Sequence, residues 1–595
     1  MKKIKFFTLL LSAFIGLSSC EDYLDVKNKG SLAEANVFET EAGADMLLNT
    51  AYVQLPNPEQ GGLTYDSWEF MSPFHVCRYN WGMTSRLYGT YDYSASVYNP
   101  GLYNHMYPSM WFMYDFLIEY IRNCNLFIEN IEKYKSNYSE EWFVKRTAEA
   151  KCLRAFYYHY IWTWYGGTPY ITETLKQEMG DDMFRPANSQ EEIYTYMCKD
   201  LEEAAQVLPN EQGEGRFTKG AALVLKAWIQ LYWGDIIHDP RPATIFPADD
   251  EKAKAAYAAC AADCKLIMEQ LGNTYGLMEN REDAFMEKNN NCKEQIFSFQ
   301  TTPTSAHHSM RSKWFGPYNT TTGRTGDFIT TGSPTPLMVD MYAMKDGRYI
   351  DDEGSTYDPE HPYENREPRF YADIVYHGSK FCNEVYSLNP GPGEQALIPG
   401  TDCWYTGYCR RKGINESLSF QQLEEEACTF NYFRYAEVLL MYAEARIKGA
   451  RLGGPAVDQS VIDALDQVRT RSAKEGLGGL PTLKETYGEG IVNDLEQLEK
   501  IIWHERIVEL SFEFKSYNDC RRNRRSDLFA KPKMALHWDY ENNQPKLEKL
   551  TDGMATFPEH LYLMPLYKDW IEQNPAWIDP NKQVDGRTNG QNPGW

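Results

Sequence analysis

The sequence AEAKCLRAFYYHYIWTWYGGTP, residues 148–169, decides the fold of this chain. Its hydrophobic residues recur three and four positions apart, which is the spacing of a helix that buries one face. The residues of this stripe are Leu153, Phe156, Tyr157, Tyr160, Ile161 and Trp164. The Gly-Gly-Thr-Pro that follows is typical of a helix end. We therefore predict a long helix whose aromatic side chains lie in the core.

Stripes with the same spacing occur at 221–232, 435–442 and 503–514, and further helices are expected near 110–134, 190–207, 249–270 and 460–472. Helices of similar length joined by short turns favour antiparallel pairs. Residues 220–234 are similar to a tetratricopeptide (TPR) helix, although no clean 34-residue repeat is present. The predicted fold is mainly α, with a TPR-like helical-repeat scaffold.

The first twenty residues have the features of an export signal. Basic residues at positions 2, 3 and 5 precede an apolar run from Phe6 to Leu17, and Ser18 and Ser19 lead to Cys20. This order predicts a cleaved signal over residues 1–19. Leu-Ser-Ser-Cys resembles the bacterial lipobox, which predicts that Cys20 is acylated and holds the chain on a membrane. The alternative is an ordinary secretory signal in which Cys20 is incidental.

The composition excludes some classes of ligand. The formal net charge is −24, and the mean hydropathy is −0.57 with 24% charged residues. Such a chain is poorly suited to nucleic acid or anionic lipid surfaces and is compatible with a neutral ligand or a basic partner. Cys260 and Cys264 are expected to be packed side chains, whereas Cys403 and Cys409 could form a disulfide after export.

Two stretches, 57–109 and 300–425, lack any sustained period and are rich in Gly, Pro and aromatic residues. Of the 47 residues from 65 to 111, 13 are aromatic, about twice the 14% of the whole chain. Aromatic rings on loops can stack on the apolar C–H faces of sugars, and polar neighbours can bind the hydroxyls. The alternative is that the rings anchor the loops to the scaffold. The candidate ligand-binding residues are Asp66, Trp68, Trp81, Arg86, Tyr88, Trp314 and Trp404, the last beside Tyr405 and Tyr408.

No catalytic motif stands out. Glu505 and Glu509 lie four residues apart, a spacing that would suit paired catalytic carboxylates, but nearby arginines make ion pairs the stronger interpretation. The basic cluster at 521–525 is likewise interpreted as scaffold. An acidic loop at 346–358 could suit calcium, although its spacing is not that of an EF-hand. We expect no enzyme activity and no cofactor, with calcium as the one open possibility.

Four segments, in order along the chain, resemble the SusD/RagB family of outer-membrane nutrient-binding lipoproteins. They are residues 148–169, GRFTKGAA at 215–222, FRYAEVLLMYAEA at 433–445 and ERIVEL at 505–510, the last followed by Tyr517-Asn518-Asp519 and Arg521-Arg522. The terminal QNPGW at 591–595 is also typical of that family. Ile507 departs from the family pattern, which commonly has Arg there. The resemblance implies four TPR-like helix pairs and a loop-rich, variable half that carries the ligand surface.

The resemblance also implies a function. The protein would bind oligosaccharides or polysaccharides at the cell surface and deliver them to a SusC-like TonB-dependent outer-membrane transporter. Glu21 and Asp22, directly after Cys20, are similar to the acidic signal that sends such lipoproteins to the surface. The expected division is 1–19 signal, 20–235 and 236–595, the last two forming one body. Alternatives are a peptide ligand, a surface glycoside hydrolase and a structural TPR adaptor.

Overall fold

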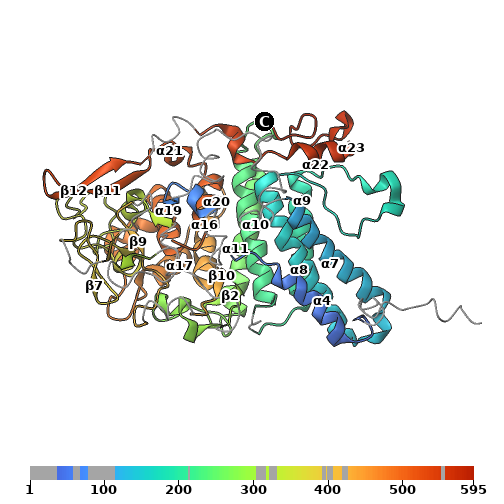
Figure 1. The fold of residues 1–595 in the computed structure, drawn as a ribbon, viewed down its shortest axis with the longest axis horizontal. Helices are drawn as coiled ribbons and strands as arrows, with labels where there is room; N and C mark the ends of the chain where they lie inside the picture. The colour runs from blue at the N-terminus through green and yellow to red at the C-terminus, as the bar shows by residue number, and fades with distance from the viewer. Residues whose placement is uncertain are drawn as a thin grey trace, which may run out of the picture.

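The structure is a computed structural model that describes residues 37–57, 68–77, 114–211, 215–302, 316–319, 332–391, 397–398, 406–418, 426–550 and 557–595. An array of long helices crosses the molecule, and short strands and loops surround its far end (Figure 1). The predicted signal and Cys20 lie outside the described residues.

The long helices follow one another in space in the order in which they follow one another in the chain. They are α4 (Glu41–Val53), α7 (Tyr114–Lys133), α8 (Glu140–Tyr165), α9 (Gln190–Val207), α10 (Lys219–His238), α11 (Asp250–Gln270), α16 (Tyr435–Arg451), α17 (Gln459–Thr470) and α19 (Leu495–Glu509). Each packs on the next from α7 to α16, and α16 then packs on both α17 and α19. The predicted mainly-α scaffold of paired helices is confirmed.

The decisive stretch forms the second half of α8. Ser139 caps the start of this helix with its hydroxyl, which accepts the N–H of Trp142, and Gly166 ends it with φ +73°. Every residue from Ala148 to Tyr165 is buried except Lys151, so the predicted core stripe is confirmed. This half of the helix is buried nearly all round, and α4, α7 and α9 all pack on α8.

The prediction is wrong at the end of the fourth stripe. α19 ends at Glu509, and the chain then turns through Phe512 and Phe514 with φ of +60° and +61° instead of continuing as a helix. Lys412 explains the turn, because its ammonium donates to the carbonyls of Glu509 and Ser511 at 2.8 and 2.9 Å. A side chain from elsewhere thus replaces the helical N–H donors at this end.

The loop-rich part contains short strands in two-stranded sheets. Among the described residues all of these pairs are antiparallel: β1 (His75–Cys77) with β4 (Gly332–Pro334), β2 (Gln295–Phe299) with β10 (Phe430–Arg434), β3 (Tyr318–Asn319) with β8 (Leu397–Ile398), β5 (Ile374–Val375) with β9 (Cys409–Arg410), β6 (Lys380–Phe381) with β7 (Glu384–Val385), and β11 (Met534–Asp539) with β12 (Gln544–Lys549). The predicted absence of sustained helical structure in these stretches is confirmed for their described parts.

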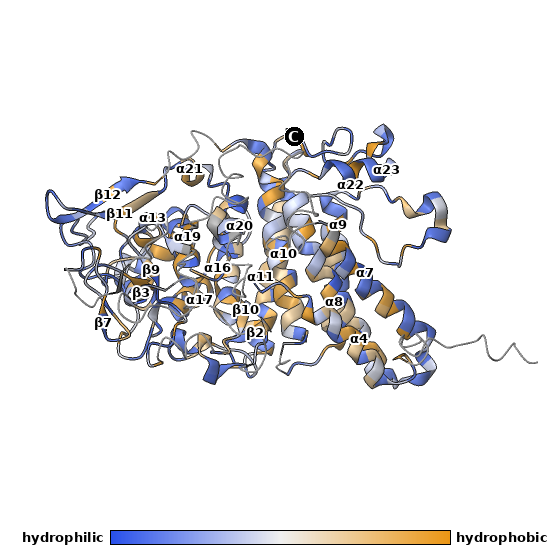
Figure 2. Cartoon of the chain, viewed as in Figure 1, coloured by the Kyte–Doolittle hydropathy of each residue, from blue (hydrophilic) through white to orange (hydrophobic). Residues whose placement is uncertain are grey.

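Hydrophobic residues concentrate along the helical array, whereas β12 is hydrophilic (Figure 2). One large cluster of buried hydrophobic residues extends from α4 to the C-terminal segment. Cys260 and Cys264 lie fully buried in it, as predicted. Within the described ranges, no helix is both long enough and apolar enough to cross a bilayer.

Candidate ligand-binding site

The predicted ligand-binding residues fall almost wholly outside the part of the chain that the structure describes. This holds for Asp66, Trp81, Arg86, Tyr88, Trp314 and Trp404. Trp68 begins the short 3-10 helix η2 (Trp68–Met71). Their contacts with a ligand stay predictions, but the described residues on either side of them show where these segments join the fold.

The first attachment point is the ladder of β1 and β4. Cys77, the last residue before the segment that carries Trp81, Arg86 and Tyr88, lies opposite Gly332 in this antiparallel pair. Gly332 in turn is the first described residue after the segment 320–331. Both segments therefore join the fold at the same end of one small sheet.

The second attachment point is the ladder of β3 and β8, in which Tyr318 lies opposite Ile398. Trp314 precedes Tyr318 by four residues and Trp404 follows Ile398 by six, so both segments leave from the same end of this pair. The segment of Trp404 rejoins the described chain at Thr406, whose hydroxyl donates to the carbonyl of Pro334 in β4. Two strand pairs and one side-chain hydrogen bond thus link the described ends of three aromatic segments, those of Trp81, Trp314 and Trp404.

A buried polar cluster includes Glu69 of η2, the short helix that begins at Trp68. Glu69 Oε1 lies 3.2 Å from His75 Nδ1 and accepts a hydrogen bond from Ser516 Oγ at 2.8 Å. Burial raises the pKa of Glu69 to about 8 and lowers the pKa of His75 to about 3. At neutral pH both are therefore uncharged. The sequence gives no sign of this cluster, because Glu69 and Ser516 are 447 residues apart.

Tyr408, predicted beside Trp404 as a possible sugar platform, is instead part of the core. Its side chain is buried, and its hydroxyl lies 3.2 Å from that of Tyr363. Tyr363 packs on Phe370 and Tyr376 with ring centroids 6.1 and 4.5 Å away. For this residue the alternative interpretation holds, because the ring anchors a loop to the scaffold.

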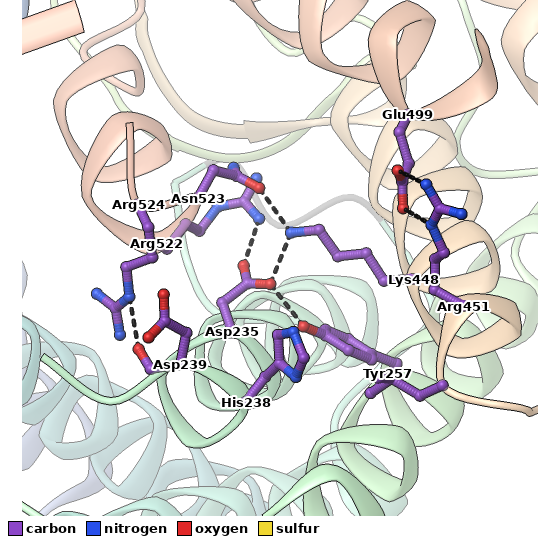
Figure 3. Close-up of a pocket in the computed structure, with 11 residues that line it drawn as sticks. Asp235, His238, Asp239, Tyr257, Lys448, Arg451, Glu499, Arg522, Asn523 and Arg524 are labelled. Atoms are coloured by element: carbon purple, nitrogen blue, oxygen red, sulfur yellow. Dashed lines mark hydrogen bonds and ion pairs between the residues drawn. The ribbon is translucent and has the colours of Figure 1, made fainter. Parts of the chain in front are cut away.

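A separate cleft of about 490 Å³ opens between α10, α11, α16, α19 and α20 (Ser516–Arg522) (Figure 3). Asp235 lies at its centre and accepts from Tyr257 Oη at 2.7 Å, Lys448 Nζ at 2.6 Å and Arg522 Nη1 at 2.7 Å. Its inner charged groups are paired with one another. The ion pairs and hydrogen bonds in the cleft therefore hold these helices together, and the predicted scaffold role of Arg522 is confirmed.

The paired carboxylates of α19 are also structural. Glu505 binds Arg369 at 2.8 Å and Arg469 at 2.5 Å, and Glu509 binds Arg434 at 2.8 Å. Although burial favours the neutral acid, neighbouring guanidinium groups hold the pKa of Glu509 well below its usual range. The predicted ion pairs are confirmed, and these fully paired carboxylates are poorly placed to transfer a proton.

The carboxylates of the acidic loop at 346–358 are likewise bound by other side chains of the protein. Asp352 accepts from Lys500 Nζ at 2.6 Å and Tyr487 Oη at 2.7 Å, and Asp351 also lies 2.9 Å from Lys500. These contacts occupy two of the carboxylates that could suit calcium. In the described part of the chain, no group of three His, Cys, Asp or Glu side chains is arranged to hold a metal ion.

Comparison with known families decides the assignment. Residues 293–595 match the SusD family, and residues 22–231 match a family described as starch-binding and associating with the outer membrane. The chain belongs to the SusD family. The two matches cover the same segments from which the sequence resemblance was drawn.

Individual relatives support the SusD fold along nearly the whole chain. A SusD-like protein of Formosa agariphila is 24% identical over 536 residues, which cover 86% of this chain and 90% of the relative. A SusD-like carbohydrate-binding protein of Bacteroides fragilis superposes with a TM-score of 0.70 at 20% identity, covering 91% of this chain and 99% of the other. A laminarin-binding SusD-like protein superposes with a TM-score of 0.60 at 18% identity, covering 93% of this chain and 100% of the other.

Proposed function

We propose that this SusD-family protein binds glycans at the outer face of the outer membrane and delivers them to a SusC-like TonB-dependent transporter. In this proposal, a lipid on Cys20 holds it at the surface. The segments around Trp81, Trp314 and Trp404 supply the sugar-binding surface. The protein carries out no covalent chemistry on the glycan.

The observation that carries the proposal is the pair of family matches over residues 22–231 and 293–595. One relative of the same fold is described as carbohydrate-binding and another as laminarin-binding, which favours sugars over other ligands. The converging attachment points add a physical reason, since a glycan needs several rings and polar groups in one place. Three aromatic-rich segments join the fold through connected strands, which is compatible with one shared surface.

Affinity electrophoresis and calorimetry test the ligand class. The purified protein, lacking residues 1–20, is run through gels that contain laminarin, soluble starch, xylan, galactan or mannan, and in parallel is titrated with a panel of oligopeptides. Retardation by at least one polysaccharide is expected. Binding to peptides without binding to any polysaccharide would replace the glycan by the peptide alternative.

Two further measurements test the remaining parts of the proposal. A barrel protein of the transporter class should co-purify with the full-length chain from detergent-solubilised membranes of the source cells, and its absence would remove the partner. Incubation with a polysaccharide that binds should release no new reducing ends. Their appearance would support the glycoside hydrolase instead, whereas an absence of any ligand would favour a structural adaptor.

A further inference from the structure

Two buried threonines connect the described ends of the aromatic segments. Thr335 follows β4 directly, Thr406 lies shortly before β9, and both side chains are buried. The Thr335 hydroxyl donates to the carbonyl of Pro73 at 3.0 Å, and its backbone N–H donates to the carbonyl of Phe74 at 2.8 Å. Thr335 therefore binds the residues that lead into β1, after which the segment of Trp81 begins.

Thr406 continues this series of hydrogen bonds toward the hairpin of β11 and β12. Its hydroxyl donates to the carbonyl of Pro334, the last residue of β4, and its own carbonyl accepts the backbone N–H of Leu536 at 2.7 Å. The next residue, Gly407, has φ +84°, and a Cβ there would lie 2.4 Å from the Leu536 carbonyl oxygen. Glycine therefore allows the chain after Trp404 to lie this close to β11.

Proline at the end of β4 explains why threonine side chains are needed at this place. Pro334 lies opposite His75 and has no backbone N–H with which to extend the ladder of β1 and β4. The hydroxyls of Thr335 and Thr406 continue the connection beyond it. Both of their hydrogen bonds are buried, so removal of either hydroxyl takes a donor from a carbonyl oxygen inside the protein.

Thr406 restricts the position of Trp404 closely. Only Tyr405 separates the two residues, so their Cα atoms lie at most about 7 Å apart. Three residues separate Cys77 from Trp81, which allows about 14 Å. A displacement of Thr406 would therefore move Trp404 with it, and a ring that is held in its binding position loses less entropy when a ligand arrives.

We propose that Thr335 and Thr406 are positioning residues of the glycan site, which hold the segments of Trp81 and Trp404 at a fixed spacing without touching the ligand. This inference rests on the proposed function, because it takes Trp404 to be a ring that stacks on the sugar. Both hydroxyls are buried and engaged by carbonyls, so their effect on affinity passes through the segments that they hold.

A double-mutant cycle at Thr406 tests this role. Thr406 is the better choice, because Thr335 also caps α13 (Pro336–Asp340) by accepting the N–H of Met338. Thr406→Val keeps the size of the side chain without its hydroxyl and is expected to weaken binding of the polysaccharide that retards wild type most by about fivefold. In a Trp404→Ala background the same substitution should change affinity by less than about twofold, because the ring that it positions is gone.

Conservative and matched variants separate positioning from a general loss of structure. Thr406→Ser keeps the hydroxyl and should bind within about twofold of wild type. Thr486→Val is the matched control, since Thr486 is also buried and its hydroxyl donates to a carbonyl at 3.0 Å. It lies in α18 (Leu483–Tyr487), which packs on α17, and its loss should leave affinity unchanged. The unfolding midpoint of every variant is measured in parallel.

Gly407→Ala is the second variant and takes the place of Thr406→Val if that protein does not fold. Its added Cβ should displace the chain from β11 and weaken binding when Trp404 is present, but not in the Trp404→Ala background. Equal losses of affinity in the two backgrounds, wild-type affinity of Thr406→Val, or wild-type affinity of Trp404→Ala would each overturn the inference. A wild-type protein that binds no polysaccharide would instead mean that the proposed function is wrong.

Discussion

Arg522 Nη1 lies 2.7 Å from Asp235 Oδ2, and this ion pair joins two helices through residues that are 287 positions apart in the chain. The same guanidinium binds Glu444 of α16 at 2.6 Å and Asp519 of its own helix at 2.8 Å. All four side chains are buried. One arginine therefore connects α10 with α16 and α20.

Arg522→Met is expected to destabilise the protein by about 3–5 kcal/mol, because it removes one of the buried cations that pair with three buried carboxylates and leaves only Lys448 and Arg506 to neutralise them. The free energy of unfolding from urea titration checks this. Arg525→Met is the matched control, since the Arg525–Asp527 pair is 31% and 57% exposed and should change the free energy by at most about 1 kcal/mol. An equal loss of unfolding free energy in both variants would show that the contacts of Arg522 between helices do not stabilise the fold.

Tyr257 of α11 gives a second test of helix packing, because a glycine from each neighbouring helix faces it. A Cβ added to Gly234 of α10 would lie 2.5 Å from the Tyr257 ring, whereas one added to Gly449 of α16 would lie 3.8 Å from the Tyr257 Cβ. Gly234→Ala should cost about 1–3 kcal/mol through overpacking. Gly449→Ala should be neutral or stabilise by up to about 1 kcal/mol through helix propensity. Thermal unfolding of the two variants compares them, and a loss in both would contradict this geometry.

The sequence predicts the helical array well because the buried face of each helix appears locally as hydrophobic residues three and four positions apart. The stripe from Leu153 to Trp164 is an example, since every one of its six residues is buried. The failure at Phe514 has a different origin. The helix ends at Glu509 because Lys412, 97 residues away in the chain, binds its carbonyl, and no local pattern reports such a contact.

The site is only partly predictable for the same reason. Aromatic enrichment identifies the segments around Trp81, Trp314 and Trp404, but it cannot separate a ligand contact from a loop anchor. Tyr408 shows the difference, because its hydroxyl contacts Tyr363 in the interior. Which segments meet depends on pairings such as Cys77 with Gly332, which join residues more than 250 positions apart.

Trp81→Ala and Trp314→Ala should each weaken polysaccharide binding by about tenfold, because each removes a ring that can stack on a sugar face. Affinity electrophoresis against the polysaccharide that retards the wild-type protein most checks this. Tyr540→Ala is the control, since Tyr540 is 76% exposed on the β11–β12 hairpin and is not one of the predicted contacts. Wild-type retardation of both Trp variants would remove these residues from the site.

Cys20→Ala should abolish display at the cell surface while leaving polysaccharide binding of the purified protein unchanged, because the lipid acts only as an anchor. Labelling of intact cells with a membrane-impermeant reagent measures display, and affinity electrophoresis measures binding. Ser19→Gly, which brings the sequence closer to the common lipobox, is the control and should be displayed like wild type. Undiminished labelling of the Cys20 variant would mean that another feature holds the protein at the surface.

Glu69→Gln is expected to change the pH dependence of stability. The folded protein holds a proton on Glu69 up to a pKa of about 8, whereas the unfolded chain loses it near 4.5. Wild-type stability therefore includes a contribution that is complete below pH 4.5 and is lost as pH rises to about 8, with a slope of up to about 1.4 kcal/mol per pH unit. Gln cannot ionise, so the free energy of unfolding of the variant should rise relative to that of the wild type between pH 4.5 and about 8.

Urea titrations of both proteins at pH 5, 6, 7 and 8 measure this difference. His75 contributes in the opposite direction, because its folded pKa of about 3 makes stability rise between pH 3 and 6.5, but it does so in both proteins and cancels from the comparison. Parallel stability curves from pH 5 to 8 would mean that Glu69 is already ionised in the folded state. The buried cluster of Glu69, His75 and Ser516 would then contain an ionised Glu69, and the neutral hydrogen-bonded arrangement would be excluded.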